Sequence, residues 1–287
     1  MLIDKQSEST EVAVDWLYCA VMGLVEGLTE FLPISSTGHL ILVGELVFDR
    51  SAPSFELGIQ LGAITAILVL YRGRLWDAAR SVVGGPSSTP QGPTNLLWLM
   101  LVAAMPAAAI GLLCRDVIFD LLYNPMTVAI TLMVGGVLLW MLEAWLDRLG
   151  DTHPDKDLTD MGLRDALVIG LFQSLALIPG TSRSGAMIAG GLLVGCKRTS
   201  AAEFSFLVGL PVLYGASCLK VVENHQAYGQ PVQMLELLTA GLTAFLSALV
   251  VVRPFVRFLQ RHTFRPFAWY RIALGGALLA LVLAGLV

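Results

Sequence analysis

The chain has 287 residues, of which 56% are hydrophobic and only 14% are charged. A soluble domain carries roughly a quarter of charged residues, so most of this surface does not face water. The formal net charge of −4 offers no basic surface for nucleic acid, which we exclude as a partner.

A polar segment, residues 1–11, precedes the apolar part of the chain. It lacks the basic start of a secretory signal peptide. We therefore expect this segment to be retained in the protein and to be poorly ordered.

The first predicted helix is interrupted. Residues 16–32 are apolar apart from two glutamates and a threonine, and they lead into Pro33 and a Ser-Ser-Thr-Gly run. Only a short apolar stretch, 40–47, follows this break. Proline and glycine break helices, and an apolar piece this short is typical of a re-entrant hairpin rather than of a second crossing. Non-helical backbone at membrane depth survives only where it is buried in protein or lines a wet cavity.

Two apolar runs, 96–113 and 126–142, have about the 17–25 residues that a helix needs to cross a bilayer. The shorter run 63–71 is counted with them as a third span. A second interrupted helix, 163–179, ends in Gly-Thr-Ser-Arg-Ser-Gly and resumes as 186–194. Three further apolar runs follow at 204–219, 235–252 and 272–287. Together these elements predict an all-α polytopic membrane protein that folds as a single integral membrane domain, 1–287.

The two interrupted regions resemble each other. The segment GLVEGLTEFLPISSTG begins at Gly23, and GLFQSLALIPGTSRSG begins at Gly170. With one residue of offset, the alignment sets Glu26 opposite Gln173, Pro33 opposite Pro179 and Ser36 opposite Ser182. This similarity predicts a duplication, with repeat one at about 12–148 and repeat two at about 163–287.

Basic residues predict how the two halves are oriented. The segment 253–271 contains five arginines and no acid, and a second basic cluster follows the 63–71 span. By the positive-inside rule both segments are cytoplasmic. Counting crossings then puts both termini and the segments 114–124 and 220–233 outside, and the segment 147–162 inside. Each half becomes a re-entrant helical hairpin plus three transmembrane helices, so an inverted-topology repeat is expected, whose broken helices form a site near the midplane.

The first break gathers acids and hydroxyls in an apolar setting. Glu26 and Glu30 are four residues apart, so on a helix they share one face. Their repulsion and desolvation require a divalent cation, an arginine or a shared proton to offset them. A merely polar helix face is the alternative, but acids within the membrane are functional by default. His39 lies three residues after Ser36, at the end of the hydroxyl-rich break, where it could instead be structural.

Arg183 is the only basic residue of the second break. Its planar guanidinium suits phosphate oxygens, and the N–H groups of the Gly/Ser turn before a helix form an anion site. Arg183 could alternatively, or in addition, neutralise Glu26 or Glu30. Acids, hydroxyls, a histidine and an arginine are together typical of phosphate ester or anhydride chemistry.

The motifs EGLTEFLPISSTGH and PGTSRSG resemble the two signature motifs of the undecaprenyl-diphosphate phosphatase family, also called bacitracin-resistance proteins. The similarity covers nearly the whole chain, including FELGIQLGA at Phe55, MPAAAIGLL at Met105 and AAEFSFLVGLP at Ala201. The resemblance implies a bacterial inner-membrane enzyme that acts at the outer face, uses Mg²⁺ or Ca²⁺, and removes the terminal phosphate of undecaprenyl diphosphate. That reaction recycles the lipid carrier of peptidoglycan synthesis and confers resistance to bacitracin.

The resemblance also implies the site residues. The catalytic set is Glu26, Glu30, Ser36, His39 and Arg183, and we expect both glutamates to bind the metal or to orient the neighbouring groups. The substrate-binding set is Ser35, Thr37, Thr181, Ser182 and Ser184. In the mechanism that we expect, Ser36 attacks phosphorus and His39 accepts its proton. Attack by His39 itself or directly by water is left open.

Rival functions belong to other classes. An inverted repeat with broken helices also builds secondary transporters, so a lipid-carrier flippase or an anion transporter is the main alternative. The phosphatidic-acid-phosphatase type requires a histidine soon after its Ser-Arg pair, whereas this chain continues with SGAMIAGGLLVG. The partners expected are the polyprenyl diphosphate lipid and the bilayer, and a homodimer is one option for the oligomeric state.

Overall fold

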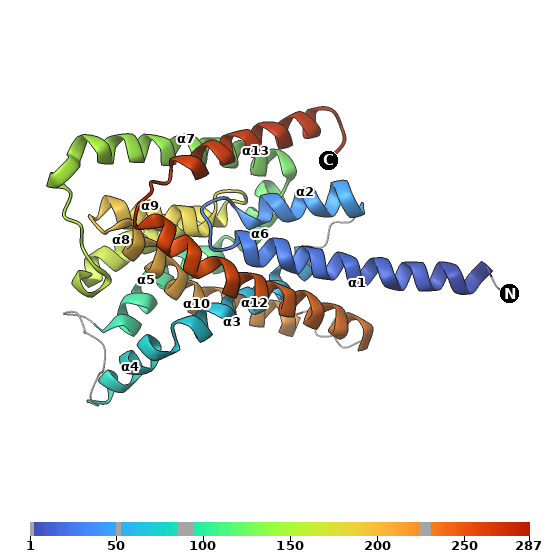
Figure 1. The fold of residues 1–287 in the computed structure, drawn as a ribbon, viewed down its shortest axis with the longest axis horizontal. Coiled ribbons are helices and arrows are strands. Elements are labelled where there is room, and N and C mark those ends of the chain that lie inside the picture. The colour runs from blue at the N-terminus through green and yellow to red at the C-terminus, as the bar shows by residue number, and fades with distance from the viewer. Residues whose placement is uncertain (1–2, 50–52, 85–94, 224–230) are drawn as a thin grey trace.

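A computed structural model describes residues 3–49, 53–84, 95–223 and 231–287 (Figure 1). Within these ranges the regular elements are helices, apart from one isolated bridge between Lys156 and Cys196. The helices of the first half are α1 (Ile3–Thr29), α2 (Ser36–Phe48), α3 (Pro53–Leu70), α4 (Arg72–Val82), α5 (Leu96–Leu113), α6 (Arg115–Leu122) and α7 (Pro125–Leu149). Those of the second half are α8 (Leu163–Ser174), α9 (Arg183–Leu193), α10 (Arg198–Glu223), α12 (Pro231–Leu259) and α13 (Arg265–Leu283). Short 3-10 turns are η1 (Gly150–Thr152), η2 (Leu158–Asp160) and η3 (Leu175–Leu177).

Five of the described helices are long and apolar enough to cross a membrane, namely α5, α7, α10, α12 and α13. The prediction of an all-α, multi-pass membrane protein is therefore confirmed. Helix α3 has 18 residues, and the part of it whose side chains the structure describes, Ile59–Leu70, is apolar. A third span in the first half and the inverted orientation of the two halves stay predictions.

Two segments that were not predicted as helices are helical in the structure. Helix α1 begins at Ile3, so the polar segment expected to be poorly ordered continues this helix. Helix α12 extends through Arg253 and Arg257 to Leu259, and α13 begins at Arg265. The basic segment 253–271 is thus mostly helix. Long arginine side chains can reach polar surroundings from a helical backbone, so their charge is compatible with helix.

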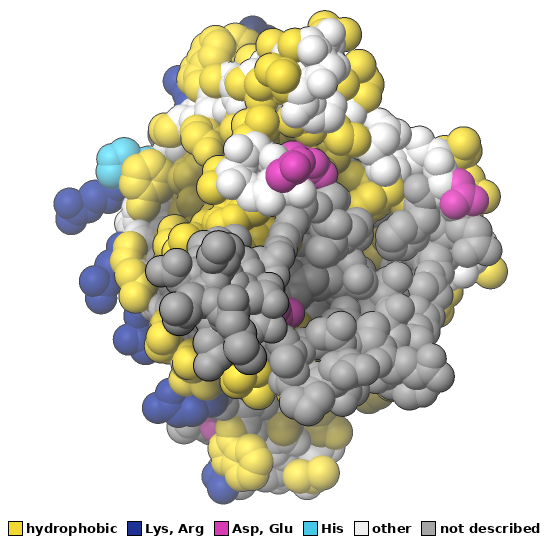
Figure 2. Space-filling model, turned by 90° about the vertical axis from the view of Figure 1, so that its right-hand side faces the viewer, with side chains coloured by type: hydrophobic (Ala, Val, Ile, Leu, Met, Phe, Trp, Pro, Cys, Tyr) yellow, Lys and Arg dark blue, Asp and Glu magenta, His cyan; other side chains and the backbone are white. Residues whose placement is uncertain are grey.

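The two ends of the molecule along its long axis differ in their charged side chains. In Figure 1 the α3–α4, α7–α8 and α12–α13 connections lie at the left, and both chain termini lie toward the right. Exposed arginines of the left end include Arg72, Arg80 and Arg261. Figure 2 looks onto the opposite end, where the described side chains are mostly hydrophobic with isolated acids, and Lys and Arg appear only at the margin.

Glycines bring the interrupted helices close to their neighbours. A Cβ atom at Gly23 or Gly27 of α1 would overlap the backbone of α12, and one at Gly170 of α8 would overlap Ala103 of α5. Small residues allow such close approach between membrane helices, where packing rather than the hydrophobic effect drives association. These contacts hold the C-terminal ends of α1 and α8, from which the two turns emerge.

The two turns have the same local backbone. Ser35 precedes α2 with φ 68° and ψ 99°, and Ser182 precedes α9 with φ 69° and ψ 113°. Positive φ at a residue other than glycine is uncommon and clusters at functional sites. Because Ser35 and Ser182 are the equivalent N-caps, Ser36 corresponds to Arg183. The predicted pairing of Ser36 with Ser182 was wrong, because the alignment was anchored on prolines that are not equivalent.

Candidate active site

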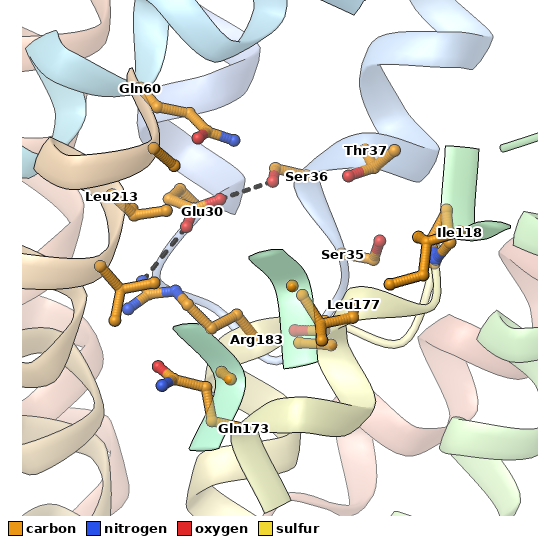
Figure 3. Close-up of a pocket in the computed structure, with 18 of the residues that line it drawn as sticks. Glu30, Ser35, Ser36, Thr37, Gln60, Ile118, Gln173, Leu177, Arg183 and Leu213 are labelled. Atoms are coloured by element: carbon orange, nitrogen blue, oxygen red, sulfur yellow. Dashed lines mark hydrogen bonds and ion pairs between the residues drawn. The ribbon is translucent and has the colours of Figure 1, made fainter. Parts of the chain in front are cut away.

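A cavity of about 280 Å³ lies where the two turns meet (Figure 3). Helices α3, α5, α6, α8 and α10 and the 3-10 turn η3 complete its wall. The polar residues that line it are Glu30, Ser35, Ser36, Thr37, Gln60, Tyr123, Gln173, Ser182 and Arg183. Six of these belong to the predicted set, so residues of both interrupted helices line one cavity.

Glu30 connects the two turns. It follows α1 directly, where its N–H still donates to the Glu26 carbonyl over 2.9 Å, and it is 7% exposed. Ser36 donates its hydroxyl to Glu30 Oε2 over 2.6 Å, and Arg183 Nη2 donates to Glu30 Oε1 over 3.2 Å. Figure 3 shows both interactions on the same carboxylate. A buried carboxylate is tolerated when it is paired and hydrogen-bonded in this way.

Ser36 and Arg183 are the first residues of α2 and α9. The first N–H groups of a helix have no partner within it, and its positive dipole end favours anions. Because the first residues of both helices line one cavity, this cavity is suited to a phosphate group.

Arg183 is held in place but not saturated. Its Nη1 donates to the Ser205 carbonyl over 3.1 Å. Its buried Nε has no hydrogen-bond partner within the described part of the chain. A Cβ atom at Gly209 would overlap the guanidinium, so the glycine leaves room for it. Arg183 can therefore hold Glu30 and still offer N–H groups to a ligand.

Four predicted residues are not among those that line the cavity. Glu26 is fully buried one turn before Glu30. Ser184 is also fully buried and donates to the Leu32 carbonyl over 2.8 Å, so it joins the two turns. Thr181 lies within the second turn between Gly180 and Ser182.

His39 is the fourth. Its Nδ1 is 2.7 Å from the Ser35 carbonyl, and its Nε2 is 2.7 Å from the Tyr270 hydroxyl of α13. The two rings are stacked with centroids 5.6 Å apart. Both ring nitrogens are thus engaged away from Ser36, whose hydroxyl donates to Glu30 instead.

Two glutamines were missed by the sequence reasoning as site residues. Gln173 is 2% exposed, and its Nε2 donates to the Ala103 carbonyl over 3.2 Å. The Oε1 atoms of Gln60 and Gln173 are buried and accept no hydrogen bond from the described residues. A glutamine within an apolar run, as in FELGIQLGA, is the signal that could have revealed Gln60.

These oxygens bear on the expected metal. Hard cations such as Mg²⁺ and Ca²⁺ prefer oxygen ligands, and Mg²⁺ often takes one or two carboxylates plus substrate phosphates. Glu30, Gln60 and Gln173 supply oxygens of this kind to the cavity. Among the described residues no group of three His, Cys, Asp or Glu is placed to hold a metal. The donor set therefore fits a cation that shares its ligands with a substrate.

The rest of the cavity wall is apolar. Leu40, Ala107, Ile118, Leu177, Val212 and Leu213 are among its residues. The cavity therefore offers charged and polar groups for an anionic group together with apolar side chains for a hydrocarbon chain. An amphipathic phosphate ester or anhydride has both parts.

Comparison with known proteins gives a consistent result. A sequence model of the family described as bacitracin resistance protein BacA matches residues 19–277. A protein named undecaprenyl-diphosphatase from Parvibaculum lavamentivorans is 44% identical over 92% of this chain and 96% of its own length. Proteins of the same name from Laribacter hongkongensis (44% identity; 91% and 94%) and Nitrosomonas europaea (43% identity; 96% and 98%) are similarly close.

Proposed function

The chain belongs to the bacitracin resistance protein family, and we propose that it is a membrane phosphatase that hydrolyses undecaprenyl diphosphate to undecaprenyl phosphate and inorganic phosphate. The similar proteins are named for this activity, and the similarity covers nearly their whole length. The product is the lipid carrier for peptidoglycan and other cell-wall polymers, and its recycling accounts for resistance to bacitracin.

One observation carries this proposal. Within a cavity lined by both polar and apolar side chains, Ser36 and Arg183 bind the two oxygens of a single carboxylate, that of Glu30. A hydroxyl next to an acceptor and a cation is the arrangement that nucleophilic attack on phosphorus requires.

In the proposed first step, Ser36 Oγ attacks the terminal phosphorus and its proton passes to Glu30. At 2.6 Å the carboxylate is within reach to act as a general base. The bond between the terminal phosphorus and the bridging oxygen breaks, and the bridging oxygen leaves with its electron pair on undecaprenyl phosphate. Arg183 and the N–H groups at the starts of α2 and α9 balance the charge on the phosphate oxygens.

In the second step, water attacks the phosphorus of the phosphoserine and the bond between phosphorus and Ser36 Oγ breaks. Protonated Glu30 returns its proton to Ser36 Oγ, and both protons of the attacking water leave with inorganic phosphate. Glu30 serves as the proton carrier in both steps. This assignment differs from the sequence-based expectation that His39 accepts the proton, because His39 contacts Ser35 and Tyr270.

A divalent cation, Mg²⁺ or Ca²⁺, is part of the proposal. Glu30 would hold it together with the carbonyl oxygens of Gln60 and Gln173, and Glu26 stays a predicted ligand. When bound, the cation neutralises charge on the phosphate oxygens.

We also propose that the protein resides in the bacterial inner membrane, with its cavity open to the outer side. The arginine-rich connections at one end support this orientation through the positive-inside rule. Ile118 of α6, in the segment predicted to be outside, lines the cavity. A homodimer stays a prediction.

The deciding experiment measures phosphate release from undecaprenyl diphosphate by purified protein in detergent, with and without a chelator. Wild type should release phosphate and Ser36→Ala should not, whereas Ser81→Ala, at the end of α4, should match wild type. A phosphoenzyme trapped by acid quench should have the acid stability and alkali lability of a phosphoserine. If no phosphoenzyme is trapped during rapid turnover, attack by Ser36 is wrong and water attacks phosphorus directly.

The alternative function is transport of a lipid carrier or an anion. Detergent removes any gradient and any second compartment, so a transporter without hydrolytic activity would release no phosphate in this assay. The names of the similar proteins favour hydrolysis.

A further inference from the structure

Arg271 is a fully enclosed arginine outside the predicted site. It lies on α13 and is 2% exposed. Its guanidinium donates to four backbone carbonyls. Nε reaches Leu132 at 3.4 Å, Nη1 reaches Pro33 at 3.3 Å, and Nη2 reaches Thr131 at 3.2 Å and Gly180 at 3.3 Å.

Two of these carbonyls occupy equivalent places in the two turns. Pro33 stands two residues before Ser35, the N-cap of α2, and Gly180 stands two residues before Ser182, the N-cap of α9. One side chain therefore binds the same position of both interrupted helices. Its other two contacts fix it to α7.

The neighbouring carbonyls are also satisfied by side chains. Ser184 donates to the Leu32 carbonyl over 2.8 Å, and Thr131 donates to the Pro179 carbonyl over 2.6 Å. Turn carbonyls buried inside a protein need such donors because no water reaches them. Arg271 is the donor that the two turns share.

The chain makes room for this guanidinium. A Cβ atom at Gly135 of α7 would overlap Nη2, and one at Gly185 of α9 would lie 3.0 Å from Nη1. Among the ion pairs of the described residues, none includes Arg271. A buried arginine without a carboxylate partner is costly, so carbonyl dipoles must compensate its charge.

We propose that Arg271 is a positioning residue that sets the separation of the two turns, so that Ser36 and Arg183 both reach Glu30. This inference rests on the proposed phosphatase function. Arg271 touches none of the reacting groups and acts through the backbone at Pro33 and Gly180. A displacement of about 1 Å at a reacting group can lower a rate about 100-fold, which gives the scale of the effect.

The four hydrogen bonds of Arg271 depend on the planar geometry of the guanidinium more than on its charge. Lysine keeps the charge but has three donors around one atom, whereas the guanidinium spreads its donors over a rigid plane. Arg271→Lys should therefore keep the fold but hold only part of the carbonyl set.

The test compares kcat, KM and the melting temperature of detergent-purified variants on undecaprenyl diphosphate. Arg271→Lys should lower kcat about 100-fold with KM within about threefold of wild type. Gly135→Ala, which crowds Nη2 without removing the charge, should lower kcat in the same way and keeps the test valid if Arg271→Lys does not fold. Arg198 provides the control, since it donates to buried Glu143 at 3.0 and 2.5 Å, outside the residues that line the cavity. Arg198→Lys should lower the melting temperature and leave kcat of the folded protein unchanged.

Two results would overturn the inference. One is a kcat within threefold of wild type in folded Arg271→Lys or Gly135→Ala. The other is a loss of kcat in Arg198→Lys as large as in Arg271→Lys, which would show a general effect of instability. An inactive wild type would instead contradict the proposed phosphatase function.

Discussion

Ser36 and Arg183 hold the same position at the start of two different helices, and each binds a different oxygen of Glu30. The nucleophile candidate and the cation candidate are therefore related by the local structure of the turns. Both of them bind one carboxylate.

Glu30 should be the residue whose loss affects the chemical step most. Glu30→Gln keeps the size of the side chain but removes the base, so kcat should fall by a factor of about 10²–10⁴. KM should change little, because Arg183 remains free to bind the phosphate. Steady-state phosphate release gives both constants. Glu203→Gln, which removes the partner of Arg74, is the matched control and should be unaffected.

Arg183 should contribute to binding and to the rate together. Arg183→Ala removes the guanidinium that balances the phosphate charge, and kcat/KM should fall by about 10³ or more. Arg183→Lys should recover part of this loss, because it restores charge without the planar fork. His153→Ala, which changes a histidine near the α7–α8 connection, should behave as wild type. Normal turnover by Arg183→Ala would contradict the assignment of Arg183 to phosphate binding.

Substitution of His39 distinguishes between the two candidate proton acceptors, His39 and Glu30. The ring of His39 contacts Ser35 and Tyr270 rather than Ser36. Loss of a general base lowers kcat by a factor of about 10²–10⁴. We therefore expect the fold-loss of kcat in His39→Gln to be at least tenfold smaller than that in Glu30→Gln. Tyr270→Phe removes only the hydroxyl and should be milder still. An equal loss in His39→Gln and Glu30→Gln would return the base role to the histidine.

The two cavity glutamines should affect the response to metal. A chelator should abolish phosphate release, and added Mg²⁺ or Ca²⁺ should restore it. In Gln60→Leu and Gln173→Leu, the metal concentration for half-maximal rate should rise by roughly tenfold, comparable to losses seen when metal-site contacts are removed. Gln260→Leu, at the exposed α12–α13 connection, is the control. Unchanged metal dependence in both cavity variants would exclude these oxygens as ligands.

Cysteine labelling checks the membrane orientation. Burial, together with the nearby Asp165 carboxylate, raises the pKa of the Cys196 thiol to about 12. The thiolate is the reactive form, so Cys196 should stay unlabelled at pH 8, whereas the exposed Cys114 should react. In cells, a membrane-impermeant maleimide should label Cys114 from outside when it is the only cysteine. If the maleimide labelled a single cysteine at position 262 (His262→Cys) from outside and left Cys114 unlabelled, the proposed orientation would be wrong.

Local patterns predicted the helices and most of the polar wall. Proline and the Ser/Gly runs marked both turns, and six of the ten predicted site residues line one cavity. The register between the turns could not be predicted, because Pro33 and Pro179 are not equivalent. The surroundings of His39 could not be predicted either, since Tyr270 approaches it from a helix 231 residues away in sequence.

By itself the sequence determined the membrane setting, the two broken helices and their phosphate-type chemistry. Hydrophobic runs, helix breakers and clustered polar side chains act over a few residues, so they can be interpreted without a fold. Only the tertiary structure decided which donor meets which acceptor. Arg271 illustrates this difference, because in sequence it ends a basic cluster, whereas in the fold it binds Pro33 and Gly180. Hydrogen bonds form over about 3 Å, and that precision comes from packing distant helices together rather than from any local pattern.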